Sequence, residues 1–142
     1  MSSKFSITYF PYPYFDSKAG VIKEVFKPTV PIRIGFNRKF TDWFQALVDS
    51  GSDKNLFPAE LGELVGIDIK NVKVRPVYGI GGVKINSYTH KINLNIEKCN
   101  FETEVDFSYE QKFPLLGRFG FFDQFRSIEF REKQRKIEFS TS

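Results

Sequence analysis

The sequence predicts an all-β domain that closes or folds over on itself and carries one or two short helices. Short apolar segments recur along the chain, and most are bounded by Gly, Pro, Asn or Asp. Only one segment has a clear helical pattern, and no alternation of strands with crossover helices is present. We expect residues 28–142 to form this single domain and residues 1–27 to form an N-terminal arm.

Composition limits the class of protein. The chain has 142 residues, of which 41% are hydrophobic, so it can bury a core and is too apolar for disorder. No apolar run approaches the roughly 18 residues of a membrane span. The net charge is +4 with Lys and Arg dispersed, which favours neither a nucleic-acid surface nor a membrane partner. A single cysteine, Cys99, and no recognisable secretory signal predict a reducing compartment, the cytoplasm.

The first half of the chain contains the arm, two predicted strands and a helix. Residues 1–27 are aromatic and interrupted by proline, so we expect an irregular segment lying across the body. The stretch 29–36, "TVPIRIGF", alternates as a strand does, with Pro31 placing its start at an edge. A second strand is expected over 38–49 after a turn at Asn37.

The stretch 57–67, "FPAELGELVGI", is the clear helix. Pro58 suits the first turn of a helix, and Glu60 and Glu63 are favourable near the positive end of its dipole. Gly66 suits the position just after a helix ends.

The second half of the chain reads as strands and one hairpin. Residues 72–78 and 85–97 are predicted strands on either side of a glycine cluster. Residues 100–108 alternate strictly, with Phe101, Thr103, Val105 and Phe107 on one face and Glu102, Glu104 and Asp106 on the other.

Two aromatic segments complete this half. A short aromatic helix is expected over 117–125. Residues 127–139 predict a hairpin that sets Ile128 and Phe130 against Ile137 and Phe139.

Three separated motifs are candidates for chemistry. An apolar strand delivers Asp49 into the turn Asp49-Ser50-Gly51, a glycine-rich stretch occupies 77–85, and Leu115-Leu116-Gly117 precedes the aromatic helix. Each has a simpler structural interpretation. Asp-Ser-Gly is a common turn, the glycines suit a hairpin tip, and two leucines before a glycine suit a buried strand that leaves a sheet.

The order and spacing of the three motifs resemble the retropepsin family, the single-domain aspartic proteases that include the retroviral ones. The resemblance runs from about Lys27 to Phe139 and implies the barrel of the acid-protease type. It also implies an aspartic endopeptidase in which two Asp-Ser/Thr-Gly turns face each other and their carboxylates share a proton and a water. Because this chain has one such turn, the resemblance implies a homodimer with Asp49 from each copy, no cofactor and no metal.

The resemblance also assigns roles to the neighbouring residues. Ser50 would brace the two turns across the dimer axis, Gly51 would let its N–H reach the carboxylate, and the Ser52 hydroxyl could donate to Asp49. A flap would close over an extended peptide, and a support would pack beneath the active-site loop. The flap residues are Tyr78, Gly79, Ile80, Gly81 and Gly82, with backbone N–H groups of Ile80 and Gly81 offered to the substrate, and the support is Leu115, Leu116 and Gly117.

Other interpretations remain open from the sequence. The same fold could serve as a catalytically silent peptide-binding or assembly module, whereas a nucleic-acid-binding barrel lacks the expected basic and aromatic stripe. The chain departs from the family pattern where Lys54 follows Asp53, and its termini leave the dimer contact undefined. His90 and Cys99 are interpreted as structural residues, since neither has a second ligand or a base at motif spacing.

Overall fold

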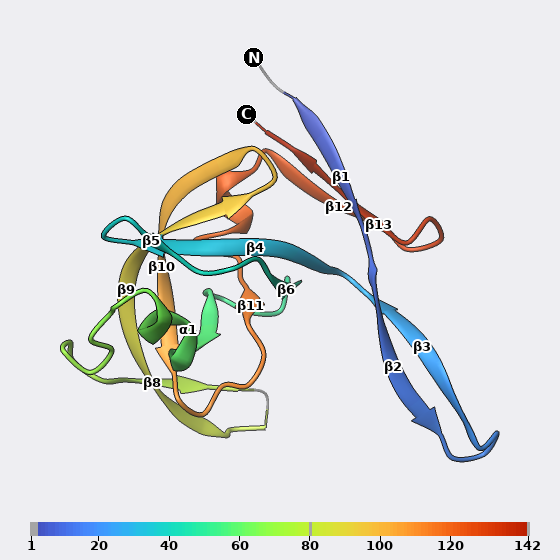
Figure 1. Cartoon of the computed structure of the whole chain (residues 1–142), viewed down its shortest axis with the longest axis horizontal. Helices are drawn as coiled ribbons and strands as arrows, with labels where there is room; N and C mark the ends of the chain where they lie inside the picture. The colour runs from blue at the N-terminus through green and yellow to red at the C-terminus, as the bar shows by residue number, and fades with distance from the viewer. Residues whose placement is uncertain (1–2, 80, 142) are drawn as a thin grey trace.

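The body of the protein is a closed β-barrel. The computed structural model describes residues 3–79 and 81–141. Six strands pair around the barrel, and pairing of the first with the last closes it (Figure 1). In barrel order these strands are β4 (Thr29–Phe36), β6 (Phe44–Val48), β11 (Leu115–Leu116), β7 (Leu56–Pro58), β10 (Cys99–Ser108) and β9 (Lys84–Ile96). The predicted closed all-β architecture is confirmed.

The strand β4 is the seam of the barrel. Its first half pairs with β6, as in Ile32 opposite Phe44, and its second half pairs with β9, as in Ile34 opposite Leu94. Pro31 lies in the first half of β4, which pairs with β6 on one side and has a free edge on the other. A proline, which has no N–H to donate, is tolerated beside such a free edge, as expected from the sequence.

The segment after β4 corrects one expectation. Asn37 and Arg38 form the turn with positive φ of 47° and 65°, and the chain then returns as β5 (Lys39–Phe40). The single strand predicted over 38–49 is therefore wrong: it is split into β5 and β6. The break at Thr41 occurs because its N–H donates to the Ile34 carbonyl while its hydroxyl accepts the Ile34 N–H.

The helices are short. The helix α1 (Ala59–Leu64) begins directly after Pro58 and is followed by Gly66 at φ +86°, which confirms the predicted helix and its exit. The expected aromatic helix over 117–125 is reduced to a 3₁₀ turn, Phe122–Gln124.

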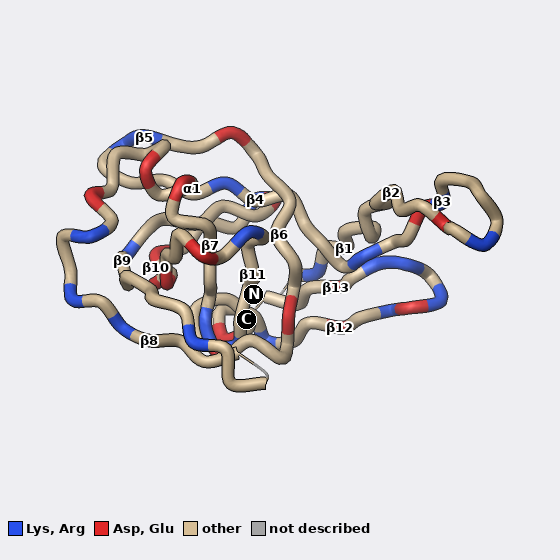
Figure 2. The backbone as a smooth tube through the Cα atoms, turned by 90° about the horizontal axis from the view of Figure 1, so that it is seen from below, with Lys and Arg blue, Asp and Glu red and all other residues tan. Residues whose placement is uncertain are grey.

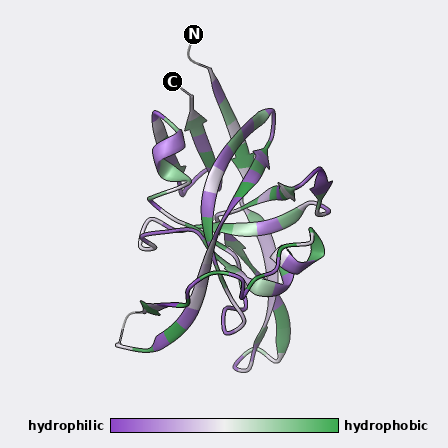
Figure 3. Cartoon of the chain, turned by 90° about the vertical axis from the view of Figure 1, so that its left-hand side faces the viewer, coloured by the Kyte–Doolittle hydropathy of each residue, from purple (hydrophilic) through white to green (hydrophobic). Residues whose placement is uncertain are grey.

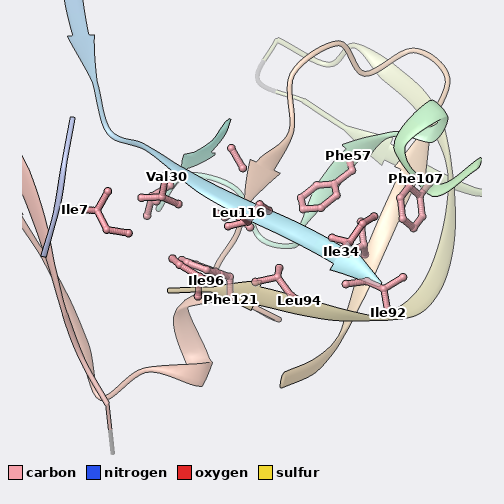
Figure 4. Close-up of a cluster of buried hydrophobic side chains, with 14 of the residues drawn as sticks. Ile7, Val30, Ile34, Phe57, Ile92, Leu94, Ile96, Phe107, Leu116 and Phe121 are labelled. Carbon is pink, nitrogen blue, oxygen red and sulfur yellow. The ribbon is translucent and has the colours of Figure 1, made fainter. Parts of the chain in front are cut away.

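The core fills the barrel with aliphatic and aromatic side chains (Figure 4). Phe57 of β7 and Phe107 of β10 are fully buried and meet edge to face, with ring centroids 6.2 Å apart. A second aromatic group lies toward the chain ends, where Phe121 packs against Phe125 and Phe139. The predicted inward face of β10 is buried at Thr103, Val105 and Phe107.

The chain ends form a separate three-stranded sheet. The predicted C-terminal hairpin is confirmed as β12 (Ser127–Arg131) and β13 (Lys136–Ser140), with Ile128 opposite Phe139 and Phe130 opposite Ile137. The strand β1 (Lys4–Thr8) pairs with the other edge of β13, so the two ends of the chain lie side by side (Figure 1).

The expectation of an irregular segment over residues 1–27 is wrong. After β1, the strands β2 (Phe10–Asp16) and β3 (Val21–Lys27) form a hairpin that projects from the body (Figure 1). Pro11 and Pro13 are tolerated in β2 because each strand of a two-stranded sheet has a free edge. Hydrophobic side chains remain exposed on this hairpin, among them Phe15 and Ile22. Along the chain as a whole, hydrophobic residues (green) are interspersed with hydrophilic ones (purple) in the strands (Figure 3).

Charges are distributed over the whole chain. Lys and Arg are interspersed with Asp and Glu on the barrel, on the β2–β3 hairpin and on the β12–β13 hairpin (Figure 2). In the part of the chain that the structure describes, the helices are too short and polar to cross a membrane.

The β8–β9 hairpin completes the barrel region. The strand β8 (Arg75–Tyr78) pairs with the first residues of β9, with Val77 opposite Ile85. This pairing extends the sheet beyond the barrel and carries the glycine-rich segment at its tip (Figure 1).

Candidate functional site

Asp49 is placed by the strand before it. The strand β6 lies between β4 and β11, so its end is held from both sides. The Val48 N–H donates to the Pro28 carbonyl at 3.0 Å, and the Asp49 N–H donates to the Leu116 carbonyl at 2.9 Å. The turn then closes with the Ser52 N–H donating to the Asp49 carbonyl at 3.1 Å. The acid is therefore presented at a defined position, immediately beyond a rigid strand.

The Asp49 carboxylate is half-buried and is oriented by its own turn. Its Oδ1 accepts the Gly51 N–H at 2.9 Å, as the family resemblance implies. A Cβ at Gly51 would lie only 3.2 Å from that oxygen, which explains why glycine fits here. Ser50 is exposed at the apex of the turn, where it is accessible to another molecule.

Ser52 does not have the predicted contact. Its hydroxyl donates to the Lys54 carbonyl at 2.7 Å. The expectation that it donates to Asp49 is wrong, because the backbone carbonyl two residues further on accepts this hydroxyl instead. Ser52 therefore stabilises the loop that follows Asp49.

The segment Leu115–Gly117 supports the Asp49 loop directly. Strand β11 pairs in parallel with β6, with Leu115 opposite Leu47 and Leu116 opposite Val48. A Cβ at Gly117 would lie 2.3 Å from the Lys54 carbonyl oxygen, so the two backbones pack in contact. The next two N–H groups also reach this loop, from Arg118 to the Ser52 carbonyl at 2.9 Å and from Phe119 to the Asp53 carbonyl at 2.8 Å.

Asn55 is a supporting residue that the sequence interpretation missed. It is fully buried, its Oδ1 accepts the Gly117 N–H at 3.0 Å, and its Nδ2 donates to the Glu104 carbonyl at 3.1 Å. It thus links β10 to the segment that carries Gly117. Asparagine near a turn is ordinarily a turn residue, so no local signal distinguishes this one.

The glycine-rich segment is a hairpin tip. The Gly79 N–H donates to the Val83 carbonyl at 2.9 Å, and Gly81 and Gly82 adopt φ of +89° and +79°. Residues with a Cβ are disfavoured at these two positions, because a positive φ brings the Cβ too close to the backbone. Tyr78 is 67% exposed at the end of β8, and Ile80 lies outside the described residues.

The Asp49 loop and the β8–β9 hairpin line one cavity of about 550 Å³. The size lies in the range of small-molecule and peptide-side-chain sites. The loop side contributes Asp49, Gly51, Ser52, Asp53, Lys54 and Leu56, the hairpin side contributes Arg75 to Gly79, and Ser87, Asp106 and Leu115 complete the wall. Of the predicted residues with described positions, Ser50, Gly81, Gly82, Leu116 and Gly117 flank this cavity without lining it.

Neither His90 nor Cys99 takes part in this site. The His90 Nε2 lies 2.8 Å from the Ile69 carbonyl oxygen, which makes it a structural contact. Burial, with the nearby charge of Glu97, raises the pKa of the Cys99 thiol, which disfavours a reactive thiolate. Among the described residues, no three His, Cys, Asp or Glu side chains are grouped to hold a metal ion.

Comparisons with known proteins place the fold. No protein-family model matches the chain, and no curated protein is detectably similar to it in sequence. Among solved structures, a retropepsin-like aspartic protease from Rickettsia conorii superposes with a TM-score of 0.64 at 13% identity, over 99% of this chain and 94% of that one. The EIAV protease bound to the inhibitor HBY-793 superposes with a TM-score of 0.52 at 16% identity, over 65% of this chain and 82% of that one. The chain therefore has the retropepsin fold that its motifs resemble.

Proposed function

We propose that the chain is an aspartic endopeptidase that acts as a homodimer, with Asp49 of each copy in the active site. One observation carries the proposal. Asp49 follows a strand that is held on both sides, its carboxylate accepts the Gly51 N–H, and it opens onto a cavity shared with a glycine-tipped hairpin. In the two superposed structures, the same fold belongs to proteins named as proteases.

The need for a second copy follows from the chemistry. Hydrolysis by carboxylates requires one that accepts a proton and another that donates one. The sequence contains one Asp-Ser-Gly turn, and Asp106 lies between Val105 and Phe107 with neither motif partner. The exposed Ser50 at the turn apex is available to meet the turn of a second copy.

The proposed reaction needs only water and the two carboxylates. Two carboxylates in contact share one proton because ionising both is unfavourable. The ionised carboxylate takes a proton from water, whose oxygen attacks the carbonyl carbon, while the protonated one donates a hydrogen bond to the carbonyl oxygen. A proton then passes to the amide nitrogen as the C–N bond breaks, which releases a carboxylic acid and an amine.

The β8–β9 hairpin is proposed as the flap. A peptide lying between it and the Asp49 loop would be shielded from water, which strengthens every polar interaction in the site. The exposed hairpin tip and the positive φ of Gly81 and Gly82 support this role, since the backbone there is free to approach a ligand. The cytoplasmic location expected from the single cysteine is part of the same proposal.

The test is digestion of a peptide library, with the cut sites identified by mass spectrometry. The wild-type protein should cleave, and the Asp49→Asn variant should not, because a carboxamide is too weak a base to take a proton from the attacking water and too weak an acid to share one with a carboxylate. Asp42→Asn is the matched control, since Asp42 is an exposed carboxylate outside the cavity. Cleavage that survives in pure Asp49→Asn protein would refute the assignment.

A second measurement tests the two-copy site. Activity per subunit should rise with protein concentration and then level off as dimers form. A monomer that cleaves at a constant specific rate at every concentration contradicts the dimer. Peptide binding without any cleavage favours the silent peptide-binding module instead.

A further inference from the structure

Asp106 is a buried carboxylate in the wall of the cavity, outside the proposed catalytic turn. It is 6% exposed, although its strand neighbours on the same face, Glu102 and Glu104, are exposed. Alternation along β10 correctly predicts the face on which Asp106 lies but not its burial. The burial arises because β10 pairs at this point with Leu56 of β7 on one side and Thr89 of β9 on the other.

The polar contacts of Asp106 leave one oxygen available. Its Oδ1 accepts the Thr89 hydroxyl at 2.6 Å. Its Oδ2 has no hydrogen bond to another described residue, and it is not among the fully enclosed atoms that lack a partner. The second oxygen therefore keeps some contact with solvent. Asp106 lines the Asp49 cavity together with Leu56 and Ser87, and it also lines a smaller neighbouring cavity of about 270 Å³ beside Glu104.

The carboxylate also has no counter-ion among the described residues. Lys54 and Arg75 line the same cavity, yet neither lies within ion-pair distance of Asp106. A negative charge this deeply buried is unfavourable unless a cation pairs with it. A long basic side chain entering from the cavity would supply that cation and satisfy the free oxygen with a charge-assisted hydrogen bond.

We propose that Asp106 determines specificity by selecting peptides with lysine or arginine in the part of the cleft formed by Leu56, Ser87 and Asp106. The inference rests on the proposed function only in taking the ligand to be a peptide in the Asp49 cavity. The leucine would contact the methylene chain of the basic residue while the carboxylate binds its charged end. Asp106 is thus assigned to substrate choice and not to the reaction itself.

The test compares matched peptides. Library digestion first gives a cleaved sequence, and three synthetic versions of it carry Lys, Gln or Glu at each position near the cut. For the wild type, one position should show a kcat/KM ratio of Lys to Gln of about ten- to hundredfold. In Asp106→Asn this ratio should fall toward about one, because the amide keeps the Thr89 contact and loses the charge. Glu104→Gln, which removes an exposed charge from the same strand, should leave the ratio unchanged.

Three outcomes overturn the proposal. The first is a wild-type protein that shows no preference for a basic residue at any position. This outcome does not depend on whether a variant folds. The second is an unchanged ratio in folded Asp106→Asn, and the third is an equal fall in Glu104→Gln.

Binding separates this proposal from the catalytic one. Peptides that carry Lys or Gln at each position in turn, chosen without reference to cleavage, are measured for affinity by fluorescence anisotropy on Asp49→Asn protein, with and without Asp106→Asn. A basic preference that depends on Asp106 supports the inference even if the wild type cleaves nothing. Cleavage without charge preference leaves the protease intact and refutes the role of Asp106.

Discussion

Replacing Gly117 by alanine tests whether the support beneath the Asp49 loop is as close as the structure shows. The added methyl would lie 2.3 Å from the Lys54 carbonyl oxygen and 2.4 Å from its carbonyl carbon. Both atoms are backbone, so no side chain can rotate to make room. The strand β11 and the loop that follows Asp49 must move apart instead.

The expected loss combines two effects. Overpacking a close contact costs about 1–3 kcal/mol. The movement also weakens neighbouring hydrogen bonds, from the Gly117 N–H to Asn55 and from the Arg118 N–H to the Ser52 carbonyl, each worth about 1 kcal/mol. The free energy of unfolding should therefore fall by about 2–4 kcal/mol, which lowers the melting temperature by on the order of 10 °C at this chain length.

The measurement is urea unfolding followed by circular dichroism, at one fixed protein concentration so that association does not differ between samples. Gly79→Ala is the matched control, because a methyl there meets only the Val83 carbonyl oxygen at an ordinary 3.8 Å. The control should unfold near the wild-type urea midpoint. A Gly117→Ala midpoint equal to that of the control would refute the close contact and the positioning role built on it.

Three further predictions follow from single residues. Asn55→Ala should lower the free energy of unfolding in urea by about 2–4 kcal/mol, since it leaves the buried Gly117 N–H without its acceptor. The control is Asn100→Ala at an exposed position, and a loss in Asn55→Ala that does not exceed the control's loss contradicts the prediction. Gly81→Val should reduce peptide turnover far more than thermal stability, because an exposed tip can relax from φ +89° into another turn at little cost to the body but then loses the backbone geometry proposed for the flap. Parallel losses would mark a purely structural turn. The hydrogen bond to Glu63 raises the pKa of Tyr109 to about 12, so this contact contributes fully below about pH 10 and is lost as pH rises through about 12. Tyrosinate absorbance of Tyr109→Phe should accordingly lack one late-titrating group, and loss of an early one would contradict the shift.

Local signals in the sequence were sufficient for much of the fold. The alternation over 100–108 predicts β10, Pro58 and Gly66 bracket α1, and the spacing of Ile128 and Phe139 gives the register of the last hairpin. Such features succeed because turn residues and strand periodicity act within a few residues of one another. The hydrogen bond from the Gly51 N–H to Asp49, which the family resemblance implied, is also local, because donor and acceptor are two residues apart.

Contacts between distant segments were decided only by the tertiary structure. The strand β1 forms because it pairs with the edge of β13, with Lys4 opposite Ser140, whereas β2 and β3 pair with each other. Asn55 becomes a buried linker because Gly117 and Glu104 come to it from other strands, and Ser52 turns to Lys54 once that loop is pressed against β11. The alternation along β10 predicts that Asp106 is exposed, whereas pairing with β7 and β9 buries it. A residue's own type and spacing determine which face it takes, whereas burial and hydrogen-bond partners depend on which remote strands the closing barrel brings beside it.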